Sequence, residues 1–365
     1  MGAIAGRPRG DAVGGSGAEG PHPVGPSGPV MGMDLGGTYL RAALADEYGR
    51  IVLERRVETL AREGREAVLG RVVALLNEVK GEAGGRGVSA VGVGAPGPLD
   101  PEAGIIRRAP TLPGWEDVPL VGVIEERVGV AAVLGNDANV AALGELAYGA
   151  GRGAEHLVYL TISTGIGGGF IAGGELLEGR RGAAGEVGHV VVEPGGPECS
   201  CGGRGHLEAL ASGTAIARQA REALSSGEDT ILGKFSGGDP ERVTAELAHE
   251  AALAGDPLCV GPLGAAGRRV GHALVGLVHL FNPEVVVLGG GVTGAGDLFW
   301  GPMHETLWGG LIPTFAEGLR LEKSALGDHA GLYGAAALAI RAVRDASAIT
   351  DASTELRTGK GGPRG

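Results

Sequence analysis

The residues best suited to acid–base chemistry lie at positions 136–139, which read Asn-Asp-Ala-Asn. An apolar run rich in β-branched residues, 130–134, precedes them and predicts a buried strand. Apolar side chains at helical spacing begin at Val140, so Asn136 and Asp137 fall where a strand ends and a helix begins. Ligands of open α/β sheets bind beyond the carboxyl ends of strands, and we therefore predict a ligand site here. Because Asn and Asp are also favoured helix caps, a capping role is the alternative.

Glycine-rich turns at three places indicate phosphate binding. Two of them join strand-like runs and carry a threonine hydroxyl, and the third follows the apolar run 285–288. A backbone N–H without a neighbouring Cβ can approach a phosphate oxygen closely, although glycines also form ordinary turns. Together the turns predict a nucleotide held between two domains, with its phosphates on the two hairpins and its nucleoside against the third turn. The residues assigned to it are Gly36, Gly37, Thr38, Thr164, Gly165, Gly167, Gly289, Gly290 and Gly291.

Two aspartates complete a prediction of phosphoryl transfer. Asp34 ends the first predicted strand, where it would hold Mg²⁺ through water, or else simply cap the turn. Asp137 would orient an attacking hydroxyl and take its proton. The helix dipole is expected to keep Asp137 ionised with a low pKa, which a loose phosphoryl-transfer transition state tolerates because it asks mainly for positioning.

A segment rich in Cys, His and Gly has the spacing of a metal site. Two cysteines and two histidines predict a structural, four-coordinate zinc ion, whereas a glycine-rich loop with free thiols is the alternative. The predicted ligands are His189, Cys199, Cys201 and His206. Cys259 is expected to be an ordinary packed thiol.

Two glutamates, Glu186 and Glu208, bracket this Cys/His segment. Carboxylates accept hydrogen bonds from sugar hydroxyls, and Asn136 can assist them. The alternative is that both are ordinary surface glutamates.

The composition excludes several classes of protein. The 365 residues suffice for two domains, and the 73 glycines follow no Gly-X-Y repeat, which excludes collagen. A formal net charge of −12 argues against a nucleic-acid partner. No apolar run reaches membrane-spanning length and no signal-peptide block opens the chain, so we expect a cytoplasmic protein with no membrane partner.

Strands and helices alternate along the chain, which predicts an α/β fold. A strand–turn–strand pattern at 30–45 returns at 157–172 and indicates a weak internal repeat. Residues 101–119 are expected to form a loop. The ends are rich in Gly, Pro, Ala and Ser and cannot bury a core, so we expect a disordered leader at 1–29 and a disordered tail at 347–365.

The motifs occur in an order that matches one known family. They are Asp34–Thr38, Gly92–Pro98, Asn136–Asn139, Ser163–Gly169, Glu186–His189, Cys199–Glu208 and Gly289–Gly291. On these residues the chain closely resembles the ROK-family sugar kinases, whose best-known members are bacterial glucokinases. The resemblance spans about residues 30 to 343, and the Cys199–Glu208 segment is its most specific part.

The resemblance implies an α/β fold of the two-domain, actin-like ATPase (ribonuclease H-like) type, with the active site in the interdomain cleft. It implies a small domain at 30–135 with the helix 331–343 packed on it, and a large domain at 136–330 that contains the zinc-binding loop 186–208. It also implies ATP and Mg²⁺, phosphorylation of a hexose 6-hydroxyl, and a homodimer or higher homo-oligomer.

Site residues follow from the same resemblance. Asp137 becomes the catalytic base, and His189 is shared between zinc and sugar. The residues that would contact the sugar are Asn136, Asp137, Glu186, His189 and Glu208.

Two departures from the family pattern bear on this interpretation. His206 stands where the family usually has a third Cys, and Thr111 stands where glucokinases often have Asn before Leu-Pro-Gly-Trp. The second departure weakens the case for glucose, and N-acetylmannosamine, N-acetylglucosamine and fructose are alternative acceptors. The non-enzyme alternatives are a sugar-responsive repressor, which would need a DNA-binding module before residue 30, and a sugar-binding protein without turnover.

Overall fold

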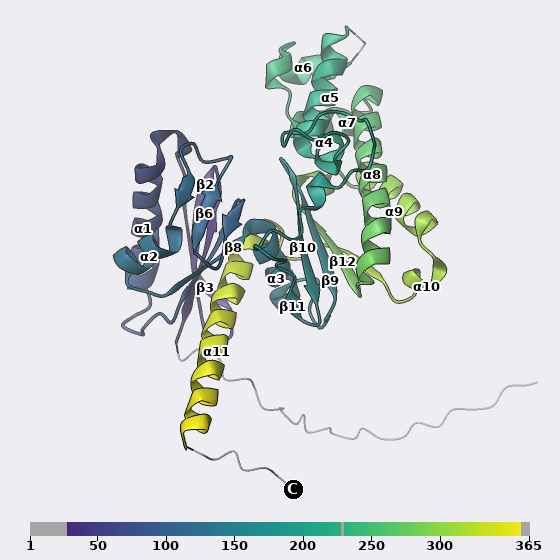
Figure 1. The fold of residues 1–365 in the computed structure, drawn as a ribbon. Coiled ribbons are helices and arrows are strands. Elements are labelled where there is room, and N and C mark those ends of the chain that lie inside the picture. The colour runs from purple at the N-terminus through teal and green to yellow at the C-terminus, as the bar shows by residue number, and fades with distance from the viewer. Residues whose placement is uncertain (1–27, 228–229, 359–365) are drawn as a thin grey trace, which may run out of the picture.

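The computed structural model describes residues 28–227 and 230–358, and it contains two five-stranded sheets that lie in two lobes (Figure 1). The first sheet has the strand order β3-β2-β1-β4-β8. Its strands are β1 (Val30–Leu35), β2 (Tyr39–Ala45), β3 (Ile51–Glu58), β4 (Val91–Ala95) and β8 (Ala132–Asn136). β1 pairs antiparallel with β2 and parallel with β4, and β4 pairs parallel with β8.

The second sheet has the order β11-β10-β9-β12-β13, which is the same topology. An antiparallel hairpin again continues into parallel strands on its other side. The strands are β9 (Leu157–Ile162), β10 (Ile166–Ala172), β11 (Glu175–Leu176), β12 (Val285–Gly289) and β13 (Arg320–Lys323). The internal repeat expected from the two strand–turn–strand patterns is therefore present as a repeat of sheet topology.

Helices cover both faces of the first sheet. On its outer face, α1 (Arg65–Gly81) and α2 (Leu120–Val128) pack on residues such as Met31 and Met33. On its inner face lies α11 (Ala330–Thr358), which approaches through Gly32: a Cβ there would lie 2.7 Å from the Leu332 carbonyl oxygen. The alternation of Met31, Gly32 and Met33 is the period of two that a strand imposes.

The second sheet is covered in the same way. The long helix α8 (Pro257–Phe281) and α9 (Asp297–Gly310) bury the outer side chains of β9 and β12, and α3 (Asp137–Tyr148) covers the inner face. The remaining helices surround this lobe, several of them at its far end (Figure 1); they are α4 (Leu207–Ala211), α5 (Gly213–Ser225), α6 (Leu232–Ser236), α7 (Ala245–Leu253) and α10 (Pro313–Ala316).

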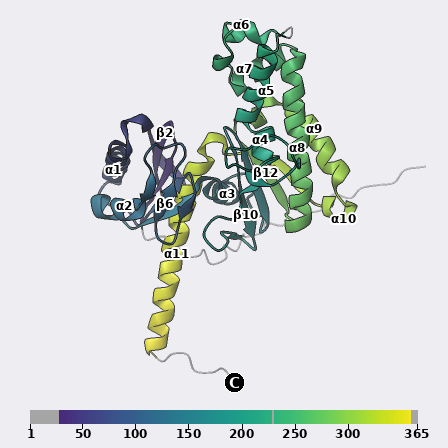
Figure 2. The same ribbon diagram turned by 45° about the horizontal axis from the view of Figure 1, so that its top comes forward.

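The two lobes meet where α3 packs against α11 (Figures 1 and 2). Glycines allow this contact: a Cβ at Gly334 would lie 1.7 Å from the Val140 carbonyl oxygen, and a Cβ at Gly144 would lie 2.5 Å from the Ala330 carbonyl oxygen. The order of layers is therefore helices, first sheet, α11, α3, second sheet, helices.

A buried carboxylate strengthens the same junction. Glu145 of α3 is fully buried. It accepts hydrogen bonds from the Ser324 hydroxyl at 2.5 Å, the Leu326 N–H at 3.0 Å and the Ala150 N–H at 2.8 Å. Residues 324–326 lead into α11. The hydrogen bonds of Glu145 therefore connect the C-terminal part of α3 to the segment that precedes α11. A buried charge is tolerated when its oxygens are hydrogen-bonded in this way.

Two sequence-based expectations are corrected. Part of the expected loop 101–119 belongs to a three-stranded antiparallel sheet of β5 (Leu99–Asp100), β6 (Ile105–Arg108) and β7 (Glu116–Val118). Strands of two to four residues are too short to show an alternating pattern. The expected tail from 347 is wrong up to Thr358, because α11 continues to that residue. No Gly or Pro interrupts the chain between Ala335 and Thr358, and alanine favours the helix.

The other residues of the predicted tail, 359–365, and nearly all of the predicted leader lie outside the described residues. Within the part of the chain that the structure describes, no helix combines the length and apolarity that a membrane span requires.

The α3–α11 contact predicts the effect of adding one methyl group. Gly334→Ala would force backbone atoms apart, and we expect the free energy of unfolding to fall by roughly 1–3 kcal/mol or more, as overpacking does. The matched control is Gly276→Ala in α8, where nothing lies within 4 Å of the added Cβ. That change should stabilise the helix by about 0.5–1 kcal/mol. Urea unfolding measures both, and equal effects of the two substitutions would contradict the close contact.

Candidate functional site

The junction predicted at 136–137 is present. β8 ends at Asn136 and α3 begins at Asp137. The Asn136 Oδ1 accepts hydrogen bonds from the N–H groups of Ala138 at 3.0 Å and Asn139 at 3.4 Å, so this residue caps the helix as the alternative reading proposed. Since the helix occupies its oxygen, Asn136 can offer a ligand only its NH₂ group, which lies against Gly97 of the loop after β4.

The pKa of Asp137 is raised, whereas the sequence predicted a low value. The Asp137 Oδ1 accepts a hydrogen bond from the Ala138 N–H at 2.8 Å, which lowers its pKa. Burial, together with the charges of Asp34 and Glu186, nevertheless raises the pKa of Asp137 to about 6. The expected helix-dipole effect is outweighed because α3 begins between the lobes, where protein atoms and two other carboxylates surround its first residue. Protein atoms surround the carboxylate at this junction, but water still reaches it, so ionisation costs less than it would in a closed core.

Asp34 comes from the other lobe. It is the fifth residue of β1 and faces the start of α11, where a Cβ at Gly331 would lie 3.4 Å from the Asp34 Cγ. Burial raises the pKa of Asp34, and Arg41 lowers it. Asp34, Asp137 and Glu186 therefore bring negative charge to this junction from both lobes. The Asp34 carboxylate is a hard oxygen donor of the kind that suits Mg²⁺.

Glu186 precedes a short 3₁₀ turn, Val187–His189, and His189 is the last residue of that turn. The His189 Nε2 lies 3.9 Å from the Glu186 Oε2, and its Nδ1 lies 3.7 Å from the Cys199 Sγ. One imidazole therefore faces a carboxylate with one nitrogen and the Cys/His cluster with the other, which is how a metal-bound histidine is commonly oriented.

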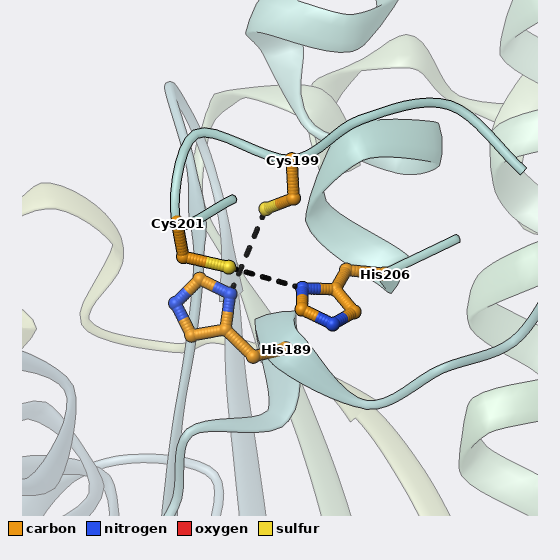
Figure 3. Close-up of side chains that lie close together, drawn as sticks. All are labelled: His189, Cys199, Cys201 and His206. Atoms are coloured by element: carbon orange, nitrogen blue, oxygen red, sulfur yellow. Dashed lines mark hydrogen bonds between the residues drawn. The ribbon is translucent and has the colours of Figure 1, made fainter. Parts of the chain in front are cut away.

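The four predicted metal ligands converge from two segments of the chain (Figure 3). Their ligand atoms all lie within 4.8 Å of one another, and the Cys201 Sγ is 3.2 Å from the His206 Nδ1. Tetrahedral zinc with ordinary Zn–S and Zn–N bonds separates neighbouring ligand atoms by roughly 3.5 Å, so the cluster has the size and the donor types that zinc requires. Cys259 is buried apart from this cluster among the side chains of the second lobe.

Glu208 connects this cluster to a glycine-rich turn. Its Oε2 accepts a hydrogen bond from the Ile166 N–H at 2.9 Å, directly after the turn between β9 and β10. Its Oε1 accepts from the Ser200 hydroxyl at 3.3 Å. A Cβ at Gly165 would lie 2.5 Å from the Glu208 Oε2, so a glycine is needed for this contact. This hydrogen bond could not be predicted from the sequence, because 42 positions separate its partners.

The assigned glycines serve two different purposes. Gly36–Thr38 and Thr164–Gly165 form the turns of the two hairpins, as predicted. Gly167 instead belongs to β10, where a Cβ would lie 2.9 Å from the Cβ of Ala138, and Gly289 faces the Tyr159 hydroxyl. For these two glycines, packing already accounts for the missing side chain.

A cavity of about 330 Å³ lies between the second hairpin turn and the third glycine cluster. It extends from Ser163 and Thr164 to Gly291, and α5 and α7 form its other walls. The polar residues of these walls were not predicted from the sequence, because on amphipathic helices they look like ordinary surface positions; Thr214, Arg221, Glu246 and His249 are among them. A cavity of this size beside phosphate-type turns suits a nucleoside.

Comparisons with known proteins agree on one family. The family described as "ROK family" matches residues 30–342 of this chain. A glucokinase from Thermotoga maritima is 41% identical over 309 residues, which cover 85% of this chain and 96% of that protein.

Two solved structures extend this likeness. One is a ROK family glucokinase from Streptomyces griseus in complex with glucose and AMPPNP, with 36% identity, a TM-score of 0.73, and coverage of 86% of this chain and 99% of that one. The other is a ROK hexokinase from Thermus thermophilus, with 40% identity, a TM-score of 0.75, and coverage of 87% and 99%. These likenesses confirm the predicted two-domain, actin-like fold.

The raised pKa of Asp137 predicts a pH-dependent gain in stability for Asp137→Asn. An acid whose pKa is higher in the folded than in the unfolded state favours folding while it is protonated, and this contribution is lost as the pH rises through about 6. Relative to the wild type, Asp137→Asn should therefore become more stable between pH 5 and pH 7.5 in urea unfolding. Asp297→Asn, at the start of α9, is the control. A gain that shrinks with rising pH would contradict the assignment.

Proposed function

We propose that this chain, which belongs to the ROK family, is an ATP-dependent hexose kinase. Glucose is the first acceptor to test. The observation that carries the proposal is Asp137: a carboxylate with a raised pKa, at a strand–helix junction where charges from both lobes meet. Glucose comes first because the Thermotoga relative is named a glucokinase and the Streptomyces structure contains glucose.

In the proposed reaction the hexose 6-hydroxyl oxygen attacks the γ-phosphorus of ATP, and the bond from that phosphorus to the β–γ bridging oxygen breaks. Asp137 orients the hydroxyl and accepts its proton. A pKa of about 6 suits this role better than the low value expected from the helix dipole, because the group is ionised at neutral pH and is still a competent proton acceptor.

The two hairpin turns and Gly291 would hold the phosphates, and the cavity lined by Thr214 and His249 would hold the nucleoside. Asp34 would hold Mg²⁺ through water, and the ion would supply charge neutralisation on the phosphates.

The sugar would lie against residues with specific donor and acceptor capacity. Asn136 has its NH₂ group available, because its oxygen caps α3. Each oxygen of Glu208 already accepts one hydrogen bond, Oε2 from Ile166 and Oε1 from Ser200, and each keeps a second lone pair for a sugar hydroxyl. Glu186 and the His189 imidazole would complete the set. Both carboxylates would accept hydrogen bonds from sugar hydroxyls, which leaves the 6-hydroxyl to Asp137.

We also propose that His189, Cys199, Cys201 and His206 hold a structural zinc ion. The convergence of four ligand atoms supports this, and so does the orientation of His189 between the cluster and Glu186. The ion would fix the loop that carries Ser200 and Glu208, and through His189 it would fix one wall of the sugar site. It would take no part in the transfer itself, because four protein ligands leave no open coordination position.

A coupled ADP-release assay tests the proposed activity. We expect phosphorylation of at least one sugar among glucose, mannose, fructose, N-acetylglucosamine and N-acetylmannosamine. Asp137→Asn should lower kcat by about 10²–10⁴-fold, as removal of a general base does, while the Kd for the sugar changes little. Asp297→Asn should leave kcat unchanged. Turnover by Asp137→Asn at the wild-type rate would refute the base assignment, and no turnover by the wild type with any sugar would refute the kinase.

Metal analysis tests the zinc proposal. The purified protein should carry about one zinc ion per chain, and Cys201→Ser should lose it. We expect Cys201→Ser to lower the Tm by roughly 5–10 °C, on a scale where 1 kcal/mol corresponds to about 2–4 °C. Cys259→Ser removes a buried thiol outside the cluster and is expected to keep the zinc. A wild type without zinc would remove the site.

A further inference from the structure

Each of the three glycine-rich turns contains a carbonyl group that accepts a hydrogen bond from a threonine hydroxyl. In the first two turns the threonine belongs to a later segment of the chain, and in the third it lies three residues further along the same 3₁₀ turn. The three hydrogen bonds have the same form: a threonine Oγ1 donates to the carbonyl of the residue directly before a turn glycine. They are Thr59 to Gly36 at 2.6 Å, Thr214 to Thr164 at 2.8 Å and Thr293 to Gly290 at 2.8 Å.

We propose that Thr59, Thr214 and Thr293 are positioning residues that orient the peptide units of these turns toward the phosphates of the nucleotide. The inference rests on the proposed kinase function, and it assigns a role to three residues to which the sequence analysis gave none.

The first turn shows the arrangement most fully. Thr59 follows β3 and is fully buried. Its hydroxyl donates to the Gly36 carbonyl, and its N–H donates to the Thr38 carbonyl at 2.8 Å. In turn its own carbonyl accepts from the Arg71 Nη1 at 3.1 Å. Thr59 therefore donates a hydrogen bond to each of the two carbonyls that flank Gly37.

The consequence follows from the planarity of the peptide bond. In a trans peptide, the carbonyl oxygen of one residue and the N–H of the next point in opposite directions. A threonine that holds the carbonyls of Gly36, Thr164 and Gly290 therefore turns the following N–H groups the other way. Those N–H groups belong to Gly37, Gly165 and Gly291.

The N–H groups of Gly37 and Gly165 have no protein acceptor among residues 28–227 and 230–358. Backbone donors are normally paired, so two unpaired donors in corresponding turns are suited to an external acceptor. Phosphate oxygens are such acceptors, and successive N–H groups in turns commonly bind them.

The second and third turns use the same device with different partners. Thr214 lies in the first turn of α5, and its N–H at 3.3 Å adds a second donor to the Thr164 carbonyl. Thr293 is buried, with 3% of its surface exposed, and its N–H donates to the Gly290 carbonyl at 3.1 Å. Thr59 and Thr293 are too deeply buried to touch a nucleotide, so their influence on it would be indirect. Thr214 lines the cavity and is exposed.

Removing the hydroxyl would leave the Gly36 carbonyl without a partner, and it would leave the Thr164 and Gly290 carbonyls with a single backbone donor each. The peptide unit that follows would then rotate more easily. A rotated unit would present its carbonyl oxygen, instead of its N–H, to the phosphate. Because this change affects the phosphate side alone, nucleotide binding should weaken while sugar binding persists.

The experiment compares Thr→Val and Thr→Ser at positions 59, 214 and 293. Binding of Mg–AMPPNP and of glucose is measured separately by calorimetry, and KM for ATP and kcat by the coupled assay. We expect each valine variant to raise the Kd for AMPPNP about tenfold, equivalent to ~1.4 kcal/mol, with the Kd for glucose within twofold of the wild type. The serine variants keep the hydroxyl and should bind AMPPNP within twofold of the wild type.

Thr306→Val is the matched control, because the Thr306 hydroxyl also donates to a backbone carbonyl, that of Pro302 at 2.8 Å, but within α9. It should leave both Kd values unchanged. AMPPNP affinities of Thr59→Val and Thr293→Val within twofold of the wild type would overturn the proposal, as would serine variants that bind as weakly as the valine variants. If Thr59→Val does not fold, Thr293→Val decides by the same criterion, because Thr293 is also buried and does not touch the cavity directly.

The binding arm also separates this inference from the proposed function. AMPPNP binding needs no turnover. A wild type that binds AMPPNP but phosphorylates no hexose would refute the kinase proposal and still allow the threonines to be tested.

Discussion

The close packing of α3 against α11 is the constraint on which the rest of the structure depends. These two helices lie back to back between the sheets, so each sheet has its inner face covered by one of them. Backbone-to-backbone contact is possible only because Gly144 and Gly334 have no side chain. Gly32 and Gly92 allow the same approach of α11 to β1 and β4. Four glycines thus set the spacing between the lobes, and the buried Glu145 fixes the approach to α11.

The electrostatics of the candidate site follow from this packing. The first residue of α3 lies where the lobes meet, close to a carboxylate from each of them, Asp34 and Glu186. A helix N-terminus favours an ionised aspartate by a fraction of a kcal/mol to about 2 kcal/mol, whereas burial beside like charges acts in the opposite direction and prevails here. The same architecture that joins the lobes therefore gives Asp137 a pKa of about 6.

The Cys/His cluster and the second hairpin turn form one continuous assembly. Glu208 joins them, because one of its oxygens accepts from Ser200 beside the cluster and the other from Ile166 beside the turn. His189 links the cluster to Glu186 in a similar way. A structural metal in this position would hold both the sugar-facing and the phosphate-facing groups of the second lobe, without contacting either substrate through the ion itself.

The sequence alone determined the features that depend on local spacing. Most long strands and helices were predictable from their periodicity, the junction at Asn136 and Asp137 from the change of period, and the Cys/His cluster from four ligand-type residues within 18 positions. The small sheet of β5 to β7 was not predictable, because its strands are too short to show an alternating pattern. The continuation of α11 was missed because the tail was predicted from its composition without regard to helix propensity.

Only the tertiary structure decided the properties that depend on partners far apart in the chain. The raised pKa of Asp137 comes mainly from burial in the folded chain, to which the charge of Asp34, about a hundred positions away, adds. The hydrogen bond from Thr59 to Gly36 spans 23 positions. The hydrogen bond from Ile166 that orients the Glu208 carboxylate spans 42 positions. Periodicity records which face of an element is apolar, but it does not record which distant residue that face will meet.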